Sequence, residues 1–183
     1  MNAHQQTTPM FRRALTVVAA AAIVLSLAAC SEEKTGLTLA ETKSPVQLLR
    51  NEAASRVPAG LVAEVENSSD ASVNCRTEET DPEGLQRSWK SSVRIVLAPD
   101  ADLDLVLSKF YVSFREDGWE QGTYGSDTIV EFTRDGSIAD IHISVKDAKD
   151  DAPAELQVQV SGPCVMTDGE SSDEVKKLEV APS

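Results

Sequence analysis

The chain has few of the residues on which most enzyme active sites depend. It holds two histidines in 183 residues, and only His142 lies outside the N-terminal segment. With one histidine in the body of the chain, neither a Ser-His-Asp nor a Cys-His nucleophilic arrangement is well supported. The same count excludes a zinc site built from several histidines. We therefore expect no catalytic residue, no metal site and no cofactor.

Positive charge is also scarce. Lys and Arg together number 17 against 30 Asp and Glu, which gives a net charge of −13. Affinity for nucleic acid comes largely from Lys and Arg that neutralise phosphates, so we expect no nucleic-acid partner. The deficit also argues against a polybasic contact with a membrane. We interpret the negative charge as a source of solubility, with attraction to cations or basic partners as the alternative.

Long apolar runs are absent except near the N-terminus. Arg12 and Arg13 precede residues 14–29, which carry no charge. This run is short for a membrane span, which needs about 20 apolar residues, and suits the apolar region of a signal peptide. It ends in Leu27-Ala28-Ala29-Cys30. These four residues resemble the lipobox of bacterial lipoproteins.

The resemblance implies that residues 1–29 are a signal peptide and that Cys30 becomes a lipidated N-terminus. Several acyl chains, palmitate among them, would hold the protein stably on the outer face of the cell membrane. An uncleaved N-terminal helix is the alternative. Met1 and Met10 are alternative starts of translation. The mature chain keeps 15 basic against 30 acidic residues, a net charge of −15. In size and layout it loosely resembles small uncharacterised envelope lipoproteins of high-GC Gram-positive bacteria.

The other two cysteines, Cys75 and Cys164, are an even number in a chain expected to be exported. Disulfides persist in such compartments, so we expect the two to pair. Two buried free thiols or a metal pair are the alternatives. Metal is disfavoured because neither cysteine has a second Cys or His at ligand spacing.

Hydrophobic periodicity and turn residues predict the elements of the rest of the chain. Residues 30–43 are polar and aperiodic, so we interpret them as a lipidated tether. Ser44 and Pro45 predict the N-cap and first position of a helix over 45–57. Asp100 or Asp102 predicts the cap of a second helix, over 100–118. Strands are predicted near 71–77, 88–97, 128–133, 138–145 and 155–161, with a strand or an extended connection at 61–66, a turn at 67–70 and a short extended piece at 119–121.

These elements predict a single α+β domain over residues 44–165. We expect a two-layer sandwich in which two helices cover one face of an antiparallel sheet of about four to six strands. His142 is predicted on the outward, solvated face of its strand. Residues 166–183 are acidic and polar, and we expect a mostly disordered tail.

Leu105 and Val112 lie nearly opposite the apolar stripe of the second helix. We predict that both are exposed, as scattered surface hydrophobes or as a partner surface. A further alternative is that the first helix or the C-terminal tail covers Leu105 and Val112.

The expected function is a non-catalytic binding or scaffolding module at the cell envelope, working as a monomer. Its partners would be the membrane, through the lipid anchor, and an envelope protein or cell-wall component. The alternative is a carrier of lipid or another small hydrophobe. A carrier would need a cavity between the second helix and the sheet, lined by Phe110, Tyr111 and Phe114.

Overall fold

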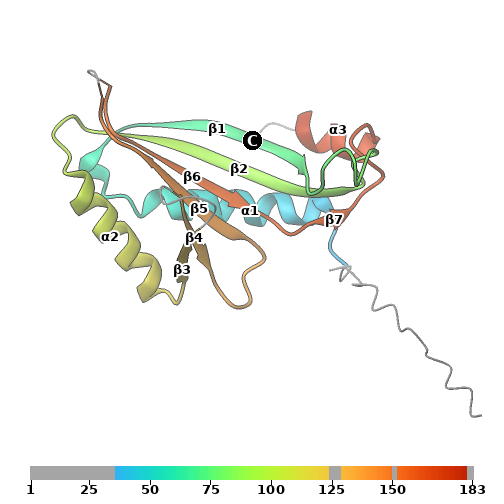
Figure 1. Cartoon of the computed structure of the whole chain (residues 1–183), viewed down its shortest axis with the longest axis horizontal. Helices are drawn as coiled ribbons and strands as arrows, with labels where there is room; N and C mark the ends of the chain where they lie inside the picture. The colour runs from blue at the N-terminus through green and yellow to red at the C-terminus, as the bar shows by residue number, and fades with distance from the viewer. Residues whose placement is uncertain (1–35, 124–128, 150–151, 181–183) are drawn as a thin grey trace, which may run out of the picture. The chain divides into compact units, whose positions relative to one another are not determined.

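A computed structural model of the chain describes residues 36–123, 129–149 and 152–180 (Figure 1). They form one antiparallel sheet of seven strands together with helices, so the predicted α+β class is confirmed. The sheet has more strands than the four to six predicted. The elements run α1 Leu39–Ser55, a 3-10 turn at Ala59–Leu61, β1 Val62–Asn74, β2 Gln86–Leu97, α2 Leu103–Glu116, β3 Glu120–Thr123, β4 Ile129–Thr133, β5 Asp140–Lys146, β6 Glu155–Ser161, β7 Val165–Met166 and α3 Asp173–Val180.

Strand β2 pairs with three other strands, β1, β6 and β7. The strand order is β1-β2-β6-β5-β4-β3, and the short β7 pairs with the start of β2. Along β2, Trp89, Val93 and Ile95 alternate with polar residues and are buried on one face. Side chains two residues apart on a strand share a face, so this alternation defines an inner face, which carries the core, and an outer face.

Two helices cover the inner face, as predicted. The strand register aligns one inner-face row across four strands: Ser91, Val160, Ile141 and Phe132. Arg50 of α1 donates a hydrogen bond to the Ser91 hydroxyl at 2.8 Å. Phe114 of α2 stacks on Phe132, with 4.6 Å between ring centroids. Because both contacts fall on the same row, α1 and α2 lie on the same face.

The first helix begins earlier than predicted. Thr38 is the N-cap, and its side chain forms a reciprocal capping box with Glu41. Leu39 in the first turn is fully buried, which adds a hydrophobic reason for this start. Pro45 therefore lies inside the helix and does not open it. The predicted tether over 30–43 is wrong for residues 39–43.

The predicted turn at 67–70 is also wrong, because β1 runs through it. The pairing of β1 with β2 shifts register between Asn67 and Ser69, as at a β-bulge, and the strand continues through these polar residues. Beyond it, the hydroxyls of Ser69 and Ser92 are hydrogen-bonded across the pair at 3.1 Å. The strand thus gains side-chain contacts with β2 where the sequence offers turn residues.

The end of the described chain is a helix and not a disordered tail. Val175 of α3 is fully buried. Ser72 donates to the Glu179 carboxylate at 2.7 Å, and the Lys43 ammonium donates to the Leu178 carbonyl at 2.6 Å. These contacts tie α3 to β1 and α1. The prediction for 166–183 is therefore wrong for the described residues 166–180.

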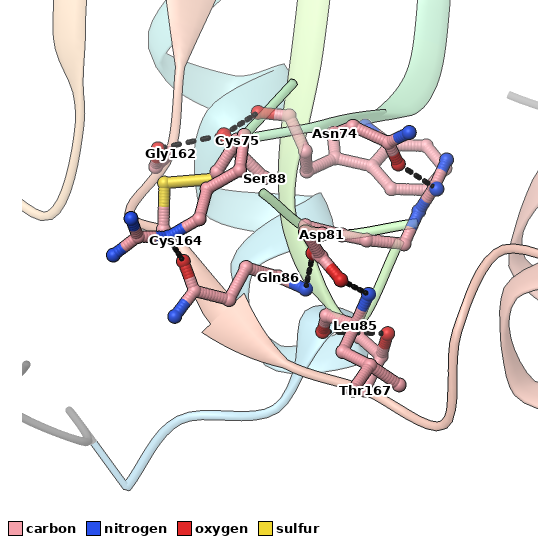
Figure 2. The surroundings of a disulfide bond; sticks show 12 residues. Asn74, Cys75, Asp81, Leu85, Gln86, Ser88, Gly162, Cys164 and Thr167 are labelled. Carbon is pink, nitrogen blue, oxygen red and sulfur yellow. Dashed lines mark hydrogen bonds between the residues drawn. A yellow bond between two sulfur atoms is a disulfide. The ribbon is translucent and has the colours of Figure 1, made fainter. Parts of the chain in front are cut away.

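The predicted disulfide joins Cys75 and Cys164, with 6.1 Å between their α-carbons (Figure 2). It links residues 89 positions apart, and the chain-entropy account gives such a crosslink at most about 4.6 kcal/mol of stability. Beside it, the Asp81 carboxylate accepts hydrogen bonds from the backbone amides of Gln86 and Leu85, at 2.8 and 2.9 Å. These bonds lower the pKa of Asp81 below its ordinary value.

Candidate functional site

The outer face of the sheet is the side opposite α1 and α2. In the part of the chain that the structure describes, no helix packs on it. The contacts of α1 and α2 fall on the inner row, and α3 contacts Ser72, which pairs with Trp89 of the inner face. It carries the polar members of the strand alternation, together with two hollows. One hollow is lined mainly by residues with polar side chains and lies in the middle of the sheet. The other is apolar and lies at one end.

A set of ion pairs crosses the outer face between the two hollows. Arg94 of β2 pairs with Glu66 of β1 and lies 3.5 Å from Glu155 of β6. Lys146 of β5 lies 3.6 Å from the same Glu155. The hydrogen bond and the charge of Glu66 raise the pKa of Arg94. These pairs are partly exposed, so they contribute little to stability and mainly fix the positions of the side chains.

The polar hollow, named here the polar pocket, encloses about 160 Å³. Its lining comes from three neighbouring strands: Ile129, His142, Ser144, Gln157 and Gln159. The register places Gln159 opposite His142, Gln157 opposite Ser144, and Ile129 on the other side of Ser144. The lining is thus one compact group of cross-strand neighbours.

His142 lies on the outer face, as predicted, but it is not a solvated residue. Its side chain is only 11% exposed, and burial lowers the pKa of the imidazole below its ordinary value. The charges of Glu131 and Asp140 oppose this shift without reversing it, and Lys90 reinforces it. The Glu131 carboxylate is 3.9 Å from Nδ1. A histidine with a lowered pKa is uncharged at neutral pH.

The apolar hollow, named here the apolar pocket, encloses about 460 Å³ at the end of the sheet. It forms where the β5–β6 connection meets the beginning of β1 and the end of β2. Backbone hydrogen bonds between Lys149 and Ala152, at 3.1 and 2.8 Å, hold that connection in shape. The pocket is lined by Ala63, Val96, Leu97, Pro99, Ala148, Lys149, Ala152 and Pro153.

The sequence alone did not reveal either pocket. Pro99, Ala152 and Pro153 lie outside the predicted strands, and Gln157 and Gln159 lie within the strand predicted near 155–161. The pockets arise from strand register, which brings together residues that are far apart in the chain. The one signal available was the position of His142 among neutral polar residues on neighbouring strands.

The predicted site residues fall in separate places. Leu105 and Val112 are exposed as predicted, at 46% and 37%, and lie on α2, away from the outer face. Cys75 and Cys164 are joined. Cys30 lies outside the described residues. The predicted partner surface on α2 and the pockets on the sheet are therefore two distinct candidates.

The aromatic stripe of α2 is packed against other rings. Phe110 and Phe114 are fully buried, with their centroids 5.0 Å apart. Phe132 lies 5.6 Å from Tyr111, and Trp119 lies 6.0 Å from Phe114. Both pockets described above are lined by other residues. The rings thus contribute to the core of the domain.

Within residues 36–123, 129–149 and 152–180, no group of three or more His, Cys, Asp or Glu residues is arranged to hold a metal ion. None of the helices described in those ranges is long and apolar enough to cross a membrane. Comparisons of the chain with protein-family models, with curated proteins and with solved structures found no match.

Proposed function

We propose that this protein is a lipid-anchored, extracytoplasmic binding module that holds an envelope protein or a cell-wall component on the outer face of its sheet. The observation that carries the proposal is the contrast between the two faces of the sheet. The inner face is closed by α1, α2 and a buried aromatic cluster. The outer face, without a helix in the described part of the chain, has two hollows. Hollows with a few converging polar groups are the usual places for ligands.

Two features support the location. The Leu27-Ala28-Ala29-Cys30 segment resembles a lipobox. The Cys75–Cys164 disulfide fits an oxidising compartment outside the cytoplasm. Neither feature depends on the other, since the cysteine of the lipobox is not part of the disulfide.

The apolar pocket lies beyond the C-terminal end of α1. The helix begins one residue after Thr38, close in sequence to the proposed anchor at Cys30. Its 17 residues extend about 25 Å at 1.5 Å per residue. Just beyond its end, the amide of Ala98 donates to the Leu61 carbonyl at 2.9 Å, beside the pocket residues Leu97 and Pro99. A partner in the apolar pocket would thus contact the domain near the C-terminal end of α1, away from its capped N-terminus.

The packing under α2 favours a binding module over a carrier. A carrier of lipid or another small hydrophobe would need a void along Phe110, Tyr111 and Phe114. Those side chains contact one another and Phe132 at ring distances typical of packed aromatic pairs. The apolar area that could line a carrier cavity is used by the core.

The anchor is tested by Cys30→Ala in the full chain. Membrane fractionation should find the processed variant in the soluble fraction and the unchanged protein with the membrane. A processed variant that still partitions with lipid would refute the lipobox interpretation.

The binding face is tested by placing a photocrosslinking amino acid at one position in the full chain and irradiating native membranes. Ala152, at the rim of the apolar pocket, is exposed, and Leu105 on α2 is the matched exposed control. We expect a defined adduct from position 152 and none from position 105. An adduct from position 105 alone would assign the partner to α2, and no adduct from either position would refute a stable partner.

A further inference from the structure

We propose that the polar pocket binds an uncharged sugar ring, which would make the partner of the outer face a neutral glycan. This inference rests on the proposed function, because it names the ligand of a face that the proposed function only identifies as a binding surface. It uses the polar pocket alone and requires nothing of the apolar pocket.

The pocket floor is a quartet of polar side chains arranged two by two. His142 and Ser144 lie on β5, and each faces a glutamine on β6, Gln159 and Gln157 respectively. Cross-strand neighbours have β-carbons about 5 Å apart, and residues two apart on a strand are separated by about 7 Å. The quartet therefore presents its polar atoms over an area about as wide as a pyranose ring.

The quartet offers donors and acceptors without charge. Each glutamine amide and the serine hydroxyl both donate and accept hydrogen bonds, and an uncharged imidazole has one donor and one acceptor nitrogen. Burial keeps His142 in that form at neutral pH. Vicinal hydroxyls have the same mixed character, so they can pair with this lining whichever way each hydroxyl turns.

The lining also lacks a carboxylate or ammonium group, in a chain with 30 acidic and 17 basic residues. Arg94, Glu155 and Lys146 are engaged with one another beside the pocket. The Glu131 carboxylate also lies beside it, 3.9 Å from Nδ1 of His142. An anionic ligand would lose its hydration, gain no counter-charge from the lining and be repelled by Glu131, whereas a neutral polar ligand loses much less. Ile129 adds one apolar side chain, against which the C–H face of a sugar ring can pack.

A peptide fits this position less well than a sugar. Extended peptides gain affinity by adding a strand at a sheet edge, where backbone amides and carbonyls are open. Here β5 is paired with β4 and β6 on both sides, so the backbone beneath the pocket is already hydrogen-bonded. Only side chains face the ligand, and those side chains suit hydroxyl groups.

The inference is tested by nuclear magnetic resonance titration of the isotope-labelled full chain in detergent micelles. The probes are neutral oligosaccharides of N-acetylglucosamine and of mannose, with oligogalacturonate as the charged comparison. We expect at least one neutral probe to shift the side-chain amide signals of Gln157 and Gln159 and the ring signals of His142 in a saturable manner. Oligogalacturonate should leave them unchanged. Absence of saturable shifts with both neutral probes, or equal shifts with the charged probe, would overturn the proposal.

Substitutions separate the pocket from the rest of the surface. Gln157→Glu with Gln159→Glu keeps the size of both side chains but introduces two carboxylates, and it should weaken binding of the neutral probe at least about tenfold. Gln121→Glu, at an exposed position on β3, is the matched control and should bind unchanged. Equal affinity of the double variant and the control would place the sugar elsewhere. The photocrosslinking at position 152 keeps the two proposals apart: an adduct there with no sugar binding refutes the sugar ligand alone.

Discussion

The buried indole of Trp89 donates a hydrogen bond to Asp70 across the β1–β2 pair, with 2.7 Å between Nε1 and Oδ1. The other oxygen of the same carboxylate accepts from the side-chain amide of Gln47 on α1. One carboxylate thus joins the edge strand β1, its neighbour β2 and the first helix. A buried indole N–H needs an acceptor, so Asp70 also satisfies a fully buried tryptophan.

Removing this acceptor should destabilise the fold. Asp70→Ala leaves the indole N–H of Trp89 without a partner, and we expect a loss of about 1–3 kcal/mol in the free energy of unfolding. Asp70→Asn keeps an oxygen acceptor and should lose less. Urea unfolding at neutral pH measures both. Equal losses in the two variants would show that the hydrogen bond to Trp89 contributes nothing of its own.

The start of α1 gives a second prediction, since the sequence and the structure place it differently. Thr38→Ala removes the side chain that caps the helix and should cost about 1 kcal/mol. Ser44→Ala is the matched control, because Ser44 lies within the helix, where alanine is at least as favourable as serine. Urea unfolding should therefore find Thr38→Ala destabilised and Ser44→Ala unchanged or slightly stabilised. If Ser44→Ala were the more destabilised of the two, the helix would begin at residue 45, as the sequence predicts.

The elements that the sequence predicted correctly are those with a strong and uninterrupted period. The second helix has a broad apolar stripe, and its observed cap is Asp102, one of the two residues predicted. In the strands β2, β5 and β6, apolar and polar residues alternate along much of the sequence, although β2 also buries several serines. In each case local pattern and tertiary burial favour the same structure, which is why the pattern alone was sufficient.

The elements that were missed are those in which tertiary contacts outweigh local signals. Residues 67–70 have turn chemistry, yet pairing with β2 carries β1 through them. The helix α3 has only Val175 buried, too little to produce a recognisable stripe. The outer pockets depend on the register between strands distant in sequence, such as Ser144 beside Gln157. No single segment contains that information.

The lowered pKa of His142 makes stability depend on pH in a defined direction. In the unfolded chain the imidazole titrates near its ordinary pKa of about 6.5, and in the folded protein it titrates lower because it is buried. As the pH falls below about 6.5, the unfolded state therefore binds the proton first, and the folded state loses stability. Above that pH the group is uncharged in both states and contributes no pH dependence.

The measurement compares the unchanged protein with His142→Gln by urea unfolding at pH 7 and at about pH 5.5, below the ordinary pKa of histidine. We expect the unchanged protein to lose more stability than the variant over this interval. The carboxylates titrate mainly at lower pH, and their effects are common to both proteins. A steeper loss in the variant would reverse the sign assigned to His142.

The exposed apolar residues of α2 give the last prediction. Leu105 and Val112 are 46% and 37% exposed, so Leu105→Asp and Val112→Asp should each change the free energy of unfolding by less than about 0.5 kcal/mol. Val106→Asp is the matched control on the same helix. Val106 is fully buried, and an unpaired carboxylate there should cost more than about 3 kcal/mol. Urea unfolding of the three variants shows whether Leu105 and Val112 are exposed or covered. A loss of several kcal/mol at Leu105 or Val112 would mean that another part of the chain packs on this side of α2, and the surface would then be unavailable to a partner.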